Sequence, residues 1–73
     1  MVDEIILQHI SEELEDVHSY MDAFHQTGNG IFKDLAKEEL SHARILKNMH
    51  EYHGESGEEF TDQFKAAEEA VRM

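Results

Sequence analysis

The sequence predicts an all-α protein, an antiparallel helical hairpin followed by a short C-terminal helix. The 73-residue chain contains no Pro and only four Gly, and it is rich in Glu, Leu, Ala and Met, which favour helix. All four Gly fall in two clusters, at 28–30 and 54–57, and glycine clusters of this kind mark turns. They divide the chain into helical segments of about 4–26, 31–53 and 57–72.

The first segment carries one apolar stripe at spacings of three and four residues, as expected for one face of a helix. The stripe consists of Leu7, Ile10, Leu14, Val17, Met21 and Phe24. The Gly28-Asn29-Gly30 turn signal follows it directly. A connection of so few residues requires the next helix to run antiparallel to the first.

The second segment repeats the same spacing, but two central positions of its stripe are titratable. The stripe consists of Phe32, Leu35, Glu39, His42, Leu46, Met49 and His53. The third segment repeats apolar residues at Phe60, Phe64, Ala67 and Val71. Ser56 and Glu59 form a capping box ahead of it, which predicts a short third helix over about 57–72.

The chain is expected to form one small domain, residues 1–73, that needs help to be stable. Domains below about 70–80 residues rarely bury enough core alone. Without Cys there are no disulfides, so a metal or a partner subunit remains. Because two amphipathic helices leave part of each apolar face exposed, we expect a homodimer that forms a four-helix bundle. Phe60 and Phe64 give the third helix an apolar edge that could extend dimers into a ring.

Composition excludes several classes of function. Asp and Glu number 17 against six Lys and Arg, and the resulting charge of −11 argues against binding to nucleic acid or to an anionic membrane surface. The lack of Cys excludes zinc–thiolate sites, iron–sulfur clusters and a thiol nucleophile. The acidic start of the chain and the absence of a long apolar run give no signal peptide or membrane span, so a cytoplasmic protein is expected.

Three residues form the candidate functional site. Glu39 and His42 leave the same helix face at spacing i, i+3, and burying an unpaired carboxylate costs several kcal/mol. On the first helix, Glu13 lies roughly 70° from the centre of the apolar stripe, whereas Glu12 lies about 170° away. If the hairpin reverses near residue 28, Glu13 lies level with Glu39 and His42.

A two-fold dimer would combine four carboxylates and two imidazoles. One Glu from each of two helices and Glu-x-x-His from each of the other two is the ligand set of dinuclear sites in four-helix bundles. Carboxylate and imidazole ligands suit iron or manganese, and zinc less exclusively. The sequence therefore predicts a dinuclear metal site that contains Glu13, Glu39 and His42.

These motifs resemble the ferritin-like superfamily. Glu13 is followed seven residues later by Tyr20, and Glu39-Leu40-Ser41-His42 lies within the segment 35–43, a pattern carried by rubrerythrins, bacterioferritins and encapsulated ferritins. The resemblance covers residues 4–53 and is closest to the encapsulated, single-hairpin proteins. It implies a di-iron ferroxidase centre across a dimer interface, with Glu13, Glu39 and His42 as ligands and Tyr20 as a neighbour. It also implies an encapsulin shell as partner, although no targeting tail is evident after Val71.

The first functional hypothesis is oxidation of Fe²⁺ by O₂ or peroxide for storage or detoxification. The alternatives are a non-catalytic metal-stabilised bundle or metal buffer, a metal-free helical adaptor, and a rubrerythrin-like peroxide-reducing protein. The lack of Cys removes the rubredoxin-type iron domain from the last of these. Tyr20 either hydrogen-bonds a ligand carboxylate, acts as an oxidisable neighbour, or is a core-edge aromatic residue.

The other histidines are less specific. His9, His18 and His25 are expected on the surface or half-buried. His50 and His53 share a helix face at spacing i, i+3 and form a second, weaker candidate for metal binding. The remaining acidic residues, Glu12, Glu15 and Asp16 among them, are expected on solvated faces, or along a path that attracts cations.

Overall fold

The computed structural model describes the backbone of residues 2–52 and 60–72 and the side chains of residues 4–49 and 60–72. Within these ranges the chain is helical, with no strand. The helices are α1 (Val2–Thr27), α2 (Gly30–Tyr52) and α3 (Thr61–Arg72). The predicted all-α hairpin with a short C-terminal helix is therefore confirmed, and the bounds of the first two helices differ from the predicted ones by at most two residues.

The turn between α1 and α2 is built by the predicted glycine cluster. Gly28 has φ +70°, a left-handed conformation that Gly adopts without steric cost, and its N–H donates to the carbonyl oxygen of Phe24 at 2.7 Å. Asn29 then caps α2, because its side-chain Oδ1 accepts the N–H of Ile31 at 3.0 Å. The chain therefore reverses within three residues, which fixes the antiparallel register.

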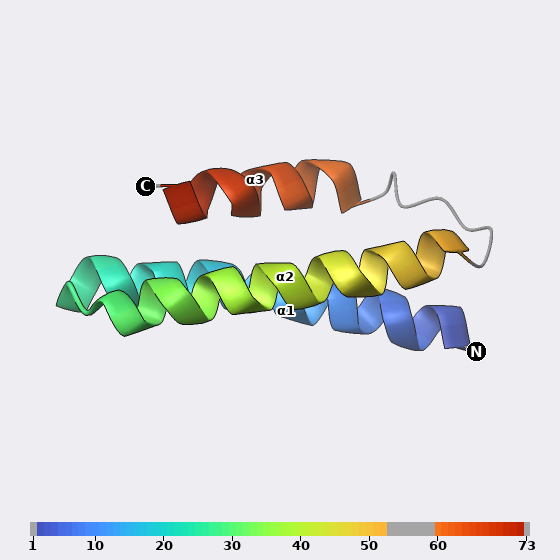
Figure 1. Cartoon of the computed structure of the whole chain (residues 1–73), viewed down its shortest axis with the longest axis horizontal. Helices are drawn as coiled ribbons and strands as arrows, with labels where there is room; N and C mark the ends of the chain where they lie inside the picture. The colour runs from blue at the N-terminus through green and yellow to red at the C-terminus, as the bar shows by residue number, and fades with distance from the viewer. Residues whose placement is uncertain (1, 53–59, 73) are drawn as a thin grey trace.

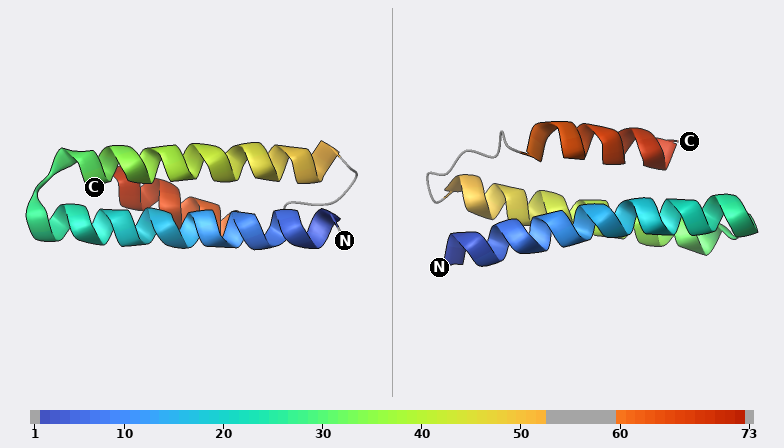
Figure 2. Two further views of the ribbon diagram at one scale, coloured as in Figure 1. Left: turned by 90° about the horizontal axis from the view of Figure 1, so that it is seen from below. Right: turned by 180° about the vertical axis from the view of Figure 1, so that it is seen from behind.

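The third helix lies along one face of the hairpin. Figure 1 shows α1 and α2 antiparallel, with α3 above them. The left view of Figure 2 shows the hairpin from the other side, with α3 behind both helices. The structure measures 41 × 19 × 13 Å, so it is one long hairpin with a single covering helix rather than a closed bundle. We call the side that α3 leaves uncovered the open face.

The predicted stripes on α1 and α3 form most of the core. The buried residues of α1 are Ile6, Ile10, Leu14, Val17 and Met21. Leu7 and Phe24, at the ends of the predicted stripe, are partly buried. In the C-terminal part, the buried residues are Phe60, Phe64 and Ala67, with Val71 partly buried beside them.

The stripe predicted for the second helix is not its most buried face. The buried residues of α2 are Ala36, Leu40 and Ala43. Each of them directly follows a residue of the predicted stripe in the sequence. His42 and Met49 are exposed, and the other described members of the stripe are half-buried. The reason is that α2 packs against both α1 and α3, so its core face turns toward α3 and the predicted stripe lies at the border of the open face.

Several predictions fall outside the described residues. The second glycine cluster and the capping box of Ser56 and Glu59 lie there, as do His53 and the side chain of His50. Among the described helices, none has a stretch of length and hydropathy sufficient to cross a bilayer.

Candidate metal centre

The three predicted ligands meet halfway along the hairpin. Glu13 comes from α1, whereas Glu39 and His42 lie one turn apart on α2. Nδ1 of His42 is 3.6 Å from Oε2 of Glu13 and 3.8 Å from Oε1 of Glu39. One ligand atom from each residue lies within 4.8 Å of the other two. The structure therefore brings together the three residues that the register calculation placed level with one another.

The two carboxylates are more enclosed than the imidazole. The side chains of Glu13 and Glu39 are 24% and 20% exposed, and that of His42 is 56% exposed. Oε2 of Glu13 is buried and has no hydrogen-bond partner among the described residues. A carboxylate oxygen removed from water without a hydrogen bond is costly, and a cation bound there would offset that cost.

Glu39 shows the electrostatic effect of this crowding. Its pKa is raised above the usual value, first by hydrogen bonding with the Glu13 carboxyl, then by burial, and then by the negative charge of Glu13. His42 and a hydrogen bond with Asp16 act in the opposite direction. Glu39 therefore keeps a proton to higher pH than an ordinary glutamate, and a metal ion that binds both carboxylates must displace that proton.

A hollow of about 410 Å³ adjoins the three residues. It is lined by His9, Glu13, His42, Ile45 and Leu46. All of these residues belong to α1 or α2, and none to α3, so we assign the hollow to the open face. A small ion can therefore reach the carboxylates from solvent without displacing a helix.

The donor set suits a divalent transition metal. Two carboxylates and one imidazole would hold iron, manganese or zinc, and three protein ligands leave coordination positions open for water, substrate or further side chains. The buried, unpartnered oxygen of Glu13 is the observation that fits these residues to a cation. When bound, such an ion would supply positive charge and, if it is iron, one-electron redox chemistry.

Tyr20 lies two helical turns beyond Glu13, toward the hairpin turn. Its side chain is partly buried against the hydrophobic core. The described residues include no hydrogen-bond partner for its hydroxyl that would connect it to the three ligands. Its proposed role next to the metal stays a prediction, and its packing agrees with a core-edge aromatic residue.

The remaining histidines with described side chains are scattered. His9 lines the hollow at the three ligands, His18 lines a different hollow, and His25 makes a tilted ring contact with Phe24 at 5.4 Å between centroids. All three are exposed, as expected for surface histidines.

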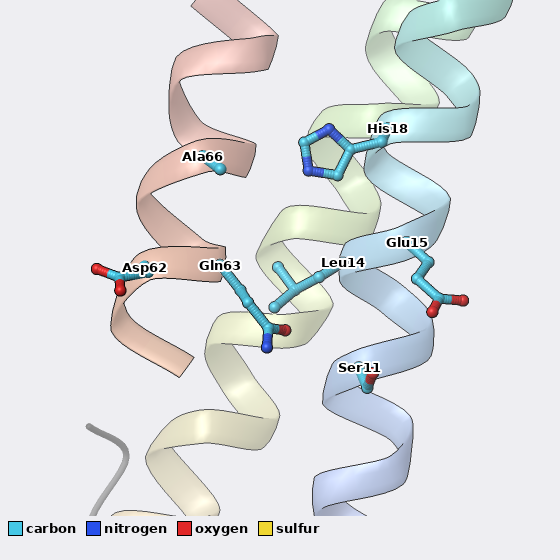
Figure 3. Close-up of a pocket in the computed structure, with 7 residues that line it drawn as sticks. All are labelled: Ser11, Leu14, Glu15, His18, Asp62, Gln63 and Ala66. Atoms are coloured by element: carbon cyan, nitrogen blue, oxygen red, sulfur yellow. The ribbon is translucent and has the colours of Figure 1, made fainter. Parts of the chain in front are cut away.

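A second hollow of about 280 Å³ lies between α1 and α3 (Figure 3). It is lined by Ser11, Leu14, Glu15, His18, Asp62, Gln63 and Ala66. Figure 3 shows the Glu15 and Asp62 carboxylates pointing away from each other, on the outer sides of their helices. Because the charged groups do not converge, this hollow is a groove between packed helices rather than a metal site.

Two residues beside the centre were not predicted as part of it. Asp16 was expected on a solvated face, and although it is exposed it also interacts with Glu39. His9 was expected on the surface, yet it lines the hollow at Glu13. A signal was present in the sequence, because Asp16 lies three residues after Glu13 and His9 four residues before it, on the same side of the helix.

Comparison of the chain with protein-family models, with curated proteins and with solved structures found no match.

Proposed function

We propose that this chain is a ferritin-like, single-hairpin protein that binds iron at Glu13, Glu39 and His42 and oxidises Fe²⁺. The observation that carries the proposal is the convergence of these three side chains from two helices, around a buried carboxylate oxygen without a hydrogen-bond partner. Two ionised carboxylates this close repel each other, and a bound cation would relieve that repulsion as a proton on Glu39 does in the metal-free chain.

The open face supports a centre shared by two copies. Ile45 and Met49 of α2 are 59% and 46% exposed there, close along the helix to His42. A second copy related by two-fold symmetry would cover these apolar side chains and would double the ligand set. Two protomers would then offer four carboxylates and two imidazoles, enough for two metal ions in a four-helix bundle.

Each residue would contribute differently to Fe²⁺ oxidation. The negative charges of Glu13 and Glu39 favour the ferric over the ferrous ion, and the imidazole of His42 completes the protein ligands. Glu39 must release its proton before it can bind the metal through both oxygens. Two Fe²⁺ ions give one electron each to O₂, which takes up two protons and leaves as hydrogen peroxide.

The hollow provides the route for the substrate. Fe²⁺ would reach Glu13 and His42 through this hollow in a single protomer, before a second copy covers Ile45. The net charge of −11 concentrates cations at the surface and repels the anionic groups of nucleic acids. Storage or detoxification of iron, a cytoplasmic location, a ring of dimers and an encapsulin shell stay predictions within this proposal.

The second candidate function is metal binding without catalysis. The same buried carboxylate pair favours it, because a metal that neutralises Glu13 and Glu39 would stabilise a small chain whether or not it is oxidised. A rubrerythrin-like reduction of peroxide uses the same ligands and differs only in the oxidant. Manganese or zinc would serve the non-catalytic candidate as well as iron would.

The deciding experiment adds Fe²⁺ to the full chain without oxygen, and then admits O₂ or peroxide. Native mass spectrometry is expected to show two metal ions per two chains, and an oxygen electrode is expected to show consumption above the protein-free rate. Glu39→Gln should lose both signals, while Glu38→Gln, an exposed neighbour on the same helix, should keep both. Metal binding with oxidation no faster than in buffer would favour the non-catalytic candidate, and chains that stay monomeric with one isolated ion each at saturating Fe²⁺ would exclude the shared centre.

A further inference from the structure

His9 belongs to the same hollow as the metal ligands, although it does not belong to their compact group. It lines the hollow together with Glu13 and His42. It precedes Glu13 by four residues, so both side chains leave the same side of α1 on successive turns. His9 is exposed, so solvent borders its ring as well as the hollow.

The surroundings of the His9 ring resemble those of a metal-binding histidine. Oε2 of Glu12 lies 3.7 Å from Nδ1 of His9. Histidines that ligate metals usually direct one ring nitrogen to a carboxylate or carbonyl group, which fixes the ring and leaves the other nitrogen for the metal. With Glu12 on the Nδ1 side, Nε2 of His9 is the nitrogen available to an ion in the hollow.

We propose that His9 is a fourth metal ligand, which binds a divalent cation in the hollow through Nε2 together with Glu13 and His42, while Glu12 orients its ring. With His9, one protomer offers two imidazoles and two carboxylates, which is enough to hold a single divalent cation before a second copy is bound. The inference rests on the proposed metal centre, and it adds a ligand that the Glu-x-x-His pattern does not include.

The test uses Zn²⁺, a diamagnetic ion that accepts the same ligands, and the ¹⁵N-labelled full chain. Long-range ¹H–¹⁵N spectra report both ring nitrogens of each histidine, and His→Gln variants assign the signals. As Zn²⁺ is added, Nε2 of His9 and a ring nitrogen of His42 are expected to shift in parallel. His18, which lines the groove beside α3, is the internal control and should not shift in that range.

Affinity measurements give the second readout. His9→Gln is expected to weaken Zn²⁺ binding about tenfold or more. Glu12→Gln is expected to weaken it about tenfold, the lower end of the roughly 10–100-fold range for residues that orient metal ligands. His18→Gln should leave the affinity unchanged. Helix content by circular dichroism checks that each variant is folded, and Gln keeps the size and polarity of these exposed positions.

The outcomes separate this inference from the proposed function. If His42 shifts while His9 does not, and His9→Gln keeps the wild-type affinity, the fourth ligand is wrong and the three-residue centre stands. If neither histidine shifts, both proposals are wrong. If His9 still responds with unchanged affinity in the Glu13→Gln variant, it binds zinc independently, and the shared hollow is wrong.

Discussion

The two faces of the α1–α2 hairpin differ in how far their apolar side chains are buried and in whether their polar atoms have partners. On the covered face, α3 buries Phe64 and Ala67 against the hairpin, and Nη2 of Arg44 pairs with Oε2 of Glu68 at 3.0 Å. Nζ of Lys47 also lies 5.9 Å from the centre of the Phe64 ring, within the range of a cation–π contact. Apolar groups there are buried and charged groups have partners.

The open face has apolar side chains exposed to solvent and a buried polar atom without a hydrogen bond. Ile45 and Met49 are exposed apolar side chains, and Glu13 holds a buried oxygen without a hydrogen bond. A monomer gains no stability from either feature. The covered face holds the chain together, whereas the open face carries the groups to which the proposed metal ion and second copy would bind. Each prediction below separates the two faces.

The largest expected effect comes from the covered face. Phe64→Ala should lower the free energy of unfolding by about 3–5 kcal/mol, because it removes a buried aromatic ring and leaves a cavity between α3 and the hairpin. Urea unfolding of the metal-free chain, followed by circular dichroism at low protein concentration, measures the loss.

The matched control is Ile45→Ala on the open face. Ile45 is 59% exposed, so the substitution should change the free energy of unfolding by no more than about 0.5 kcal/mol under the same conditions. Equal losses for the two variants would show that the open face is already covered in the metal-free protein, and the contrast between the faces would be lost.

The next largest effect concerns association. Ile45→Gln with Met49→Gln should raise the dimer dissociation constant about ten- to a hundredfold. Full burial of one such side chain contributes about 1.5–3 kcal/mol, these two are only 59% and 46% exposed before association, and each tenfold in affinity is about 1.4 kcal/mol. Sedimentation analysis in the presence of metal measures it. Ala66→Gln, an exposed position on α3, is the control and should leave association unchanged. An unchanged dimer in the double variant would place the interface elsewhere.

Much of this arrangement could be predicted from the sequence because local signals agree. The glycine cluster at 28–30 specified the turn, and a turn of that length specified the register. The register then placed Glu13 level with Glu39 and His42, and the 3.6 Å distance between Glu13 and His42 agrees with it. Apolar spacing on α1 and α3 identified most of the core, because the buried residues of these helices are mostly large aliphatic or aromatic side chains at helical spacing.

The core face of α2 could not be predicted in the same way. All three helices contact one another, so the number of partners does not set α2 apart; its core face differs in carrying small residues. Two small residues, Ala36 and Ala43, are buried there, and Ala gives a weak hydrophobic signal because it is also a good helix former on exposed faces. The predicted stripe described the face next to the metal centre instead.

A smaller effect is expected of pH on the stability of the folded chain. Because the pKa of Glu39 is raised in the folded chain, its stabilising contribution is full below the usual value of 4.5 and is lost as pH rises through the raised pKa. The metal-free protein should therefore be less stable relative to Glu39→Gln at neutral pH than at pH 4. Thermal unfolding of both proteins across this range measures the difference.

The control for this prediction is Glu38→Gln, which removes an exposed carboxylate next to Glu39 on α2. Its stability relative to the wild type should be nearly independent of pH. Divalent metal should reverse the order at neutral pH, because it binds the deprotonated wild-type pair and not the amide. A pH dependence that is the same for both variants would refute a special environment at Glu39.

The smallest expected effect is at the ion pair on the covered face. Arg44 and Glu68 are 50% and 37% exposed, so solvent and salt screen their attraction. A double-mutant cycle with Arg44→Met and Glu68→Gln should give a coupling below about 1 kcal/mol that decreases with added salt. A coupling of about 3 kcal/mol that is insensitive to salt would contradict this and would mean that charge holds α3 in place. A weak coupling together with a large loss for Phe64→Ala would mean that apolar burial positions α3 on one face, while the charged groups of the proposed metal centre lie on the other.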